Sequence, residues 1–184
     1  MKIQWQKTIR INAPVEQVYA YLADFTRHGE WAQTIAEIRQ TRPGDKQGVG
    51  AVYRTYERQA MQANRTPGER LRRGMKAVTV CEVKELIPNQ RIVWHAYMTP
   101  SVGMYADLRF EFAAAPDGGT LLTQHIFMYA PALMGLMFRL MFGRELHQKS
   151  YAQWEASLNN IQLLLEQKVV VRTDAAAPQA KLAY

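Results

Sequence analysis

The chain has 184 residues, of which 48% are hydrophobic and 21% are charged, and its formal net charge is +7. These proportions are ordinary for one globular domain, and they exclude a disordered or fibrous chain. The single cysteine, Cys81, excludes an internal disulfide bond.

The sequence carries no signal for secretion or membrane insertion. The first residues lack the apolar core of a signal peptide, and the longest apolar run, residues 130–143, is interrupted by Arg139 and is too short to span a bilayer. We therefore expect a cytoplasmic protein. We expect one domain over residues 1–168 and a tail over residues 169–184, which is rich in small residues and has no hydrophobic period.

The first half of the chain predicts three strands and two short helices. Residues 2–11 alternate polar and apolar side chains, which is typical of a strand with one face in water. Pro14 is suited to the first position of a helix, and residues 24–32 predict a second short helix or turn. Strands are expected over residues 35–41 and 49–58, with a turn rich in glycine and proline between them.

Four more strands are expected in the second half, after a polar connection over residues 59–73. The third of them alternates most clearly, and its apolar set predicts the side that faces the interior. The four strands cover residues 74–86, 91–99, 104–114 and 120–128, and the interior set of the third is Ala106, Leu108, Phe110 and Phe112.

The pairing of the last two strands decides which side chains of residues 120–128 face the interior. If Ala114 pairs with Gly119, His125 points inward. A slip of one residue points Gln124 inward instead, because successive side chains of a strand lie on opposite faces. We favour the first of these registers.

The last predicted element is a long helix over residues 131–167. Its second half carries apolar side chains at steps of three and four, which is one stripe of an amphipathic helix. A stripe of this width must be buried, and the strands before it supply a sheet as the partner. The stripe consists of Tyr151, Trp154, Leu158, Ile161 and Leu165.

The first half of this helix is apolar on both faces and rich in methionine. Methionine and leucine adapt their shape, so this segment could form the wall or gate of a pocket. A segment without a polar face could equally contact a second copy of the chain or a membrane surface, so a homodimer stays open.

Four local patterns carry a resemblance to a known family. They are INAPVEQVYAYLADFTRHGEW, GVGAVYRTY, VTVCEVKELIPNQRIVWHA and GGTLLTQHIFMY. With the order of the elements, they resemble the START-like (SRPBCC, helix-grip) superfamily over residues 3–167, specifically its polyketide cyclase/dehydrase-type branch. The patterns are apolar spacings and turns, so they predict a fold better than an activity.

The resemblance implies an α+β helix-grip fold. In this fold a curved, seven-stranded antiparallel sheet wraps around the long C-terminal helix, and two short helices follow the first strand. It also implies a cavity between sheet and helix, which in relatives holds sterols, phospholipids, polyketides, quinones or plant hormones. On this basis residues 1–168 form a START-like ligand-binding domain.

The sequence contains no constellation that proves a reaction. No two of its four histidines have the spacing of metal ligands, no serine lies in a nucleophile elbow, and no glycine-rich phosphate loop is present. We expect neither a metal nor a cofactor. The weak catalytic candidates are His125, His95 and Tyr56, since polar groups in a dry pocket can move protons. For each of them, a hydrogen-bonded strand residue without a catalytic role is the favoured interpretation.

Candidate ligand contacts are the side chains that the predicted elements and the resemblance together turn toward the cavity. They are Trp31, Tyr56, Trp94, Leu108, Phe110, His125, Met128, Met134, Phe138, Tyr151 and Trp154.

The positive charge is concentrated between Arg54 and Lys76, where seven basic residues stand against two acidic ones. Such a stretch is most often a solvated loop. As a binding surface it would meet an anionic lipid or an acidic protein. No nucleic-acid motif is present and only Tyr56 interleaves the basic residues, so we expect no nucleic-acid partner.

Three functional hypotheses follow. The favoured one is a non-enzymatic protein that binds or carries a hydrophobic small molecule, such as a lipid, a quinone or a polyketide-like compound. The second is a polyketide cyclase, aromatase or dehydratase that needs no cofactor, which requires polar side chains converging inside the cavity. The third is an interaction module that uses the basic surface between Arg54 and Lys76.

Overall fold

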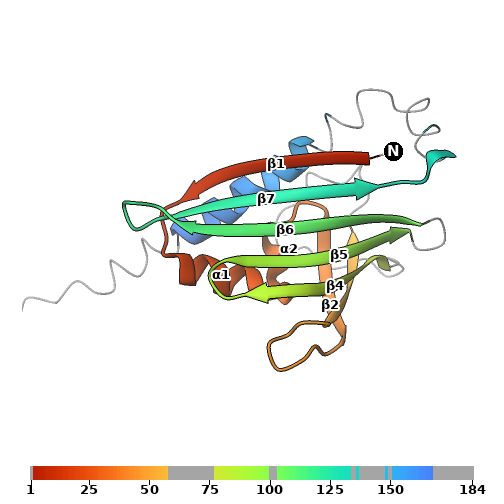
Figure 1. The fold of residues 1–184 in the computed structure, drawn as a ribbon, viewed down its shortest axis with the longest axis horizontal. Coiled ribbons are helices and arrows are strands. Elements are labelled where there is room, and N and C mark those ends of the chain that lie inside the picture. The colour runs from red at the N-terminus through yellow and green to blue at the C-terminus, as the bar shows by residue number, and fades with distance from the viewer. Residues whose placement is uncertain are drawn as a thin grey trace, which may run out of the picture.

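A seven-stranded antiparallel sheet forms one layer of the protein in the computed structural model, and helices cover one of its faces (Figure 1). The structure describes residues 2–57, 77–99, 103–133, 136, 148 and 151–167. Three predicted features lie outside the described residues. They are the polar connection 59–73, most of the methionine-rich half of the long helix, and the tail 169–184.

The order of the elements follows the prediction from the sequence. In chain order they are β1 (Lys2–Ile11), α1 (Val15–Ala23), the 3₁₀ helix η1 (Phe25–Arg27), α2 (His28–Trp31), β2 (Ile35–Arg42), β3 (Val52–Glu57), β4 (Ala77–Ile87), β5 (Arg91–Thr99), β6 (Met104–Ala114) and β7 (Thr120–Tyr129), followed by a helix over residues 151–167. The strands lie in the order β1-β7-β6-β5-β4-β3-β2. The helix-grip fold is thereby confirmed.

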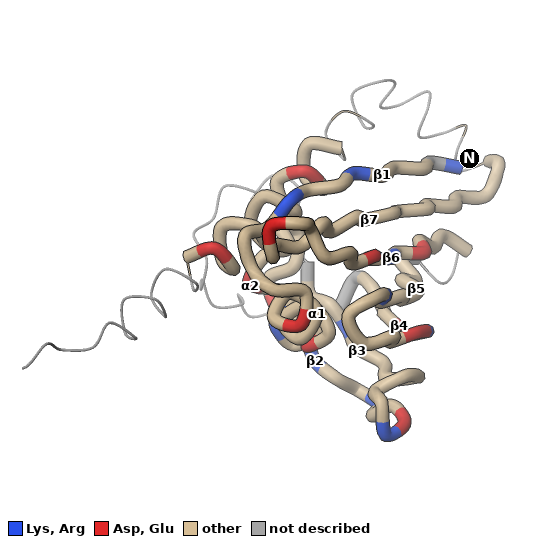
Figure 2. The backbone as a smooth tube through the Cα atoms, turned by 60° about the vertical axis from the view of Figure 1, so that its left-hand side comes forward, with Lys and Arg blue, Asp and Glu red and all other residues tan. Residues whose placement is uncertain are grey.

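The helix over residues 151–167 lies against the same face of the sheet as α1 and α2. In Figure 1 it crosses behind β1 and β7, and the turned view of Figure 2 leaves all three helices on one side of the strands. Its amphipathic stripe explains this position, because Leu158, Ile161 and Leu165 are at most 1% exposed. Burying each of these side chains contributes roughly 1.5–3 kcal/mol.

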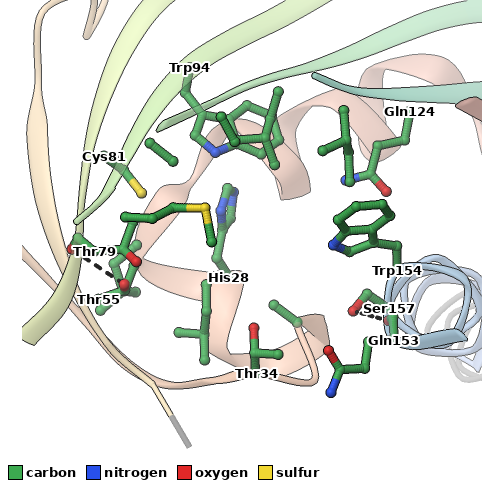
Figure 3. A pocket seen from close by; sticks show the side chains of 18 of the residues that line it. His28, Thr34, Thr55, Thr79, Cys81, Trp94, Gln124, Gln153, Trp154 and Ser157 are labelled. Carbon is green, nitrogen blue, oxygen red and sulfur yellow. Dashed lines mark hydrogen bonds between the residues drawn. The ribbon is translucent and has the colours of Figure 1, made fainter. Parts of the chain in front are cut away.

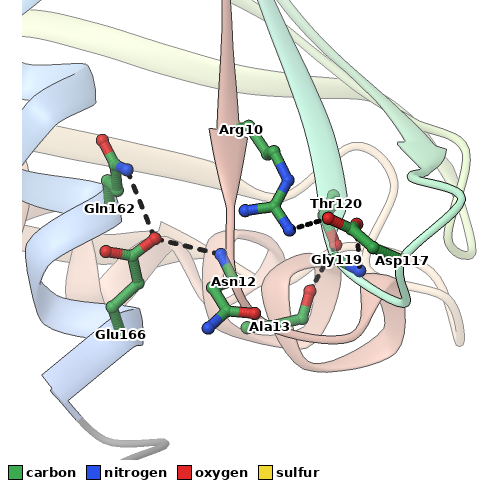
Figure 4. Close-up of polar contacts among 8 residues, drawn as sticks. All are labelled: Arg10, Asn12, Ala13, Asp117, Gly119, Thr120, Gln162 and Glu166. Carbon is green, nitrogen blue, oxygen red and sulfur yellow. Dashed lines mark hydrogen bonds and ion pairs between the residues drawn. The ribbon is translucent and has the colours of Figure 1, made fainter.

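Polar contacts fix the angle at which this helix sits. The Asn160 side chain donates to the carbonyl of Trp31 over 3.0 Å, and the Gln33 backbone N–H donates to the Ser157 hydroxyl over 3.2 Å. At the far end, the backbone N–H of Asn12 donates to the Glu166 carboxylate over 3.0 Å (Figure 4). These bonds tie the helix to the residues just after β1 and at the end of α2.

Lys7 is the exception in the alternation of β1, and the helix explains it. Its ammonium group pairs with the carboxylate of Glu155 on the helix over residues 151–167. A cation on the inner side of an edge strand is therefore neutralised at the rim of the sheet.

The favoured register of the last hairpin was wrong. Ala114 pairs with Thr120, one residue later than expected. The loop is closed by the Ala115 N–H donating to the Gly119 carbonyl over 2.8 Å, with Gly118 at a φ of +84°. A turn followed by a left-handed glycine is a common three-residue hairpin loop, and its length sets the pairing. As a result Gln124 faces the interior and His125 faces outward.

The prediction for β6 is confirmed. Ala106, Phe110 and Phe112 are buried, and Leu108 lies on the same side of the strand.

Among the described residues, no helix is long and apolar enough to cross a membrane.

Candidate ligand-binding site

A cavity of about 370 Å³ lies between the inner face of the sheet, α2 and the helix over residues 151–167 (Figure 3). Its position follows from three small side chains that lie side by side on neighbouring strands. Ala106 on β6 pairs with Ala96 on β5, and Ala96 pairs with Cys81 on β4. Because these three side chains are short, they leave the space between the sheet and the helix unfilled.

Five of the predicted contacts line this cavity. Trp94, Leu108 and Met128 come from the sheet, Trp31 comes from α2, and Trp154 comes from the helix over residues 151–167. Trp94 also packs against Phe110 with a centroid distance of 5.2 Å, so this part of the wall adjoins the core. Phe110 is fully buried behind the cavity and belongs to the core.

The other predicted contacts lie elsewhere. Tyr151 is half-buried and packs on Trp154 without lining the cavity, and Tyr56 lies under the guanidinium group of Arg39. Met134 and Phe138 fall outside the described residues.

None of the three weak catalytic candidates lines the cavity. His125 bonds to the Glu111 carboxylate over 3.0 Å, and His95 bonds to Asp107 over 2.6 Å, both on the outer face of the sheet. Tyr56 follows Thr55, which lines the cavity, and does not line it itself. The expectation that His125 projects inward was wrong, because the hairpin loop shifts β7 by one residue.

His28, which the sequence did not single out, lies in the cavity wall. It is 3% exposed, and it packs between Phe25 and Trp31 at centroid distances of 4.3 and 4.8 Å. Burial lowers the pKa of its imidazole to about 4. The ring is therefore neutral at neutral pH.

The hydrogen bond of His28 fixes which nitrogen carries the proton. Its Nε2 lies 3.0 Å from the Leu22 carbonyl oxygen, and a carbonyl only accepts. Nε2 is therefore the donor, and Nδ1 of the neutral ring is left as an acceptor.

Two polar atoms in the cavity wall are buried without a hydrogen-bond partner in the described part of the chain. They are the Trp31 indole Nε1 and the Gln124 amide Oε1, in residues that are 4% and 3% exposed. Leaving a buried polar group unpaired costs about 1–3 kcal/mol, so native structures contain few of them. An unpaired donor and an unpaired acceptor in one cavity indicate a place for a polar group of a ligand.

Two hydroxyl groups of the wall bond to the backbone. Thr55 donates to the carbonyl of Thr79 over 3.3 Å, and Ser157 donates to the carbonyl of Gln153 over 2.9 Å (Figure 3). These groups shape the wall while their polar atoms are already engaged.

The described part of the cavity wall contains no Asp, Glu, Lys or Arg side chain. The described residues also contain no group of three or more His, Cys, Asp or Glu side chains that could hold a metal ion. The arrangement is therefore suited to an uncharged, mostly apolar guest.

Comparison with known structures supports the fold. An aromatase/cyclase, Zhui from Streptomyces sp. R1128, superposes with a TM-score of 0.68 at 17% identity, over 92% of this chain and 96% of that one. A START superfamily protein from Mycobacterium smegmatis gives 0.60 at 15% identity, over 89% and 97%. The two-domain aromatase/cyclase BexL from the BE-7585A biosynthetic pathway gives 0.64 at 17% identity, over 90% of this chain, which spans 50% of BexL.

No curated protein matches the sequence. The profile of the family described as polyketide cyclase / dehydrase and lipid transport matches residues 2–158. This match covers β1 through about the first half of the last described helix, and it agrees with the helix-grip architecture. The chain therefore belongs to the polyketide cyclase/dehydrase and lipid transport family, and its fold is similar to that of a START superfamily protein.

Proposed function

We propose that this protein binds a hydrophobic small molecule in the cavity between the sheet and the helix over residues 151–167. The supporting observation is a hollow of about 370 Å³ whose wall is mostly apolar and holds two unpaired polar atoms. Its volume lies in the usual range of small-molecule sites, roughly 300–1,000 Å³. Lipids, quinones and polyketide-like compounds are the classes that this wall favours.

Tryptophan fluorescence and native mass spectrometry test this proposal. Trp31, Trp94 and Trp154 line the cavity, so an occupant should change their emission. The delipidated protein would be exposed to a library of lipids, quinones and aromatic polyketides. We expect a one-to-one adduct in the mass spectrum and a saturable change in fluorescence.

A matched pair of variants ties the binding to the cavity. Ala106→Leu fills the hollow from β6, and we expect affinity to fall by more than tenfold. Ala113→Leu makes the same change on the same strand at an exposed position, and affinity should be kept. A library that yields no bound species, or equal binding by both variants, would refute the proposal.

Catalysis of polyketide cyclisation is the second candidate. It is supported by three polar groups in the cavity wall, on His28, Trp31 and Gln124. In an aldol cyclisation a base removes a proton from a methylene group, and the carbanion attacks a carbonyl of the same chain. The resulting alkoxide takes up a proton, and loss of water followed by enolisation yields the aromatic ring. The lowered pKa of His28 makes it a weak base at neutral pH, and for this reason binding comes first.

A linear poly-β-ketone thioester, followed by mass spectrometry of the products, separates the two candidates. Ring formation faster than in buffer, and lost in His28→Phe, would favour the enzyme. Binding of the same compound without acceleration would favour the carrier.

A further inference from the structure

Both unpaired polar atoms belong to cavity residues that neighbour the fully buried Phe110. Gln124 pairs across the sheet with Phe110, and the Trp31 ring meets the Phe110 ring at a centroid distance of 5.9 Å. Both residues therefore flank the same core side chain. Met98 on β5 and Met128 on β7 also line the cavity, and both are half-buried. They lie farther along their strands from the position of Phe110 and Gln124.

The two atoms have opposite hydrogen-bonding character. The Trp31 indole N–H can only donate, and the Gln124 Oε1 can only accept. A hydroxyl group satisfies both at once, since its oxygen accepts and its proton donates. A ketone or an ether could satisfy only the indole.

Electrostatics exclude a charged group at this position. The described wall holds no Asp, Glu, Lys or Arg, and its one histidine is neutral. Lys7, the register partner of Gln124 on β1, is not part of the wall, and its ammonium group pairs with Glu155. A carboxylate or phosphate beside these two atoms would lose its water and gain no cation, which is strongly unfavourable.

We propose that the cavity takes an uncharged molecule with its hydroxyl-bearing end inward, and that this hydroxyl group bridges the Trp31 Nε1–H and the Gln124 Oε1. The apolar remainder of the molecule extends toward the half-buried Met98 and Met128. The inference rests on the proposed function and adds the ligand's charge, functional group and direction. It selects alcohols and phenols over free fatty acids and other anionic lipids.

Four naphthalene derivatives test it by calorimetry on the full chain. Naphthol both accepts and donates, methoxynaphthalene only accepts, naphthalene does neither, and naphthoate is an anion. We expect naphthol to bind about tenfold tighter than methoxynaphthalene, the effect of one buried hydrogen bond, and naphthoate to show no binding at neutral pH.

Two variants assign the effect to the two atoms. In Gln124→Met the preference for naphthol over methoxynaphthalene should disappear, because the acceptor is gone. Trp31→Phe should weaken the binding of naphthol and of methoxynaphthalene by about tenfold, because each loses one neutral hydrogen bond. Naphthalene makes no such bond, so its affinity should change by less than about threefold. If a variant does not fold, the comparison of the four compounds on the unaltered protein still tests whether the cavity prefers a hydroxyl group.

The outcomes separate this inference from the proposed function. If naphthol and naphthalene bind equally, or if naphthoate binds as tightly as naphthol, the hydroxyl bridge is refuted and the binding function stands. If neither these compounds nor any library compound binds, both the proposed function and the hydroxyl bridge are refuted.

Discussion

His28 shows how a single buried side chain links the cavity to pH. Its imidazole is held among aromatic rings and hydrogen-bonds a carbonyl, so the folded protein takes up a proton only near pH 4. In the unfolded chain the same ring takes up a proton near its ordinary pKa of 6.5. The unfolded state therefore binds more protons between these two values, and stability falls as the pH falls through them.

We predict that His28→Gln removes this pH dependence. The lowered pKa corresponds to about 3 kcal/mol of unfolding free energy that the native protein loses between neutral pH and about pH 4. Glutamine keeps a donor for the Leu22 carbonyl and carries no titrating group. Urea unfolding across this range should show the variant less stable at neutral pH and the difference narrowing on acidification. Parallel curves for the two proteins would contradict the prediction.

Thr120 gives a second test at a single residue. Its side chain is fully buried, and its hydroxyl donates to the Ala13 carbonyl over 2.7 Å (Figure 4). Thr120→Val removes the donor and leaves a buried carbonyl unpaired, so we expect a loss of about 1–3 kcal/mol in unfolding free energy. Thr123→Val is the control, because Thr123 shares an exposed hydrogen bond with Thr8. Equal losses in the two variants would count against the argument.

At the scale of the element, the alternation of strands and the spacing of helical residues were sufficient to predict most of the fold. The strand over residues 104–114 and the stripe from Leu158 to Leu165 were predictable, because a buried face imposes a period of two on a strand and of 3.6 on a helix. The hairpin between β6 and β7 was not, because a loop of three or four residues fits the same sequence. Its pairing depends on the left-handed conformation of Gly118.

The same hairpin yields a prediction about its two glycines. A Cβ atom on Gly118 would meet nothing within 4 Å, whereas a Cβ atom on Gly119 would lie 2.8 Å from the carbonyl oxygen of Ile11. Gly118→Ala should cost about 1 kcal/mol for its positive φ alone. Gly119→Ala should cost more, because the β1 backbone would have to move. Chemical unfolding of both variants measures the order, and the reverse order would refute the contact.

At the scale of the whole molecule, the family resemblance predicted a cavity, but the sequence did not predict all of the polar side chains that line it. Trp31, Trp94 and Trp154 were predictable as large side chains on inward positions. His28 was missed, since it lies in a helix of a single turn. Gln124 was considered only as the alternative to His125, because its direction depends on the pairing of β7. The hollow itself comes from three small residues on three strands, a coincidence that appears only once the strands are paired.

That origin of the cavity predicts a conflict between stability and binding. Ala96 lies between Ala106 and Cys81, so Ala96→Leu adds apolar volume where the structure is empty. We expect its unfolding free energy to rise by about 1 kcal/mol, because the new side chain is buried without displacing others. Ligand affinity should fall by more than tenfold in the same variant.

Ala51 is the control position for this prediction, because it is buried outside the cavity. It is 1% exposed and does not line the cavity, so Ala51→Leu must displace neighbours and should cost about 1–3 kcal/mol. If the hollow exists to hold a guest, the protein gives up stability at Ala96 that it could have gained by filling the space. Urea unfolding and ligand titration of both variants test this directly. A destabilised Ala96→Leu variant would mean that the row of small residues is already packed, and the central claim of a cavity would fail.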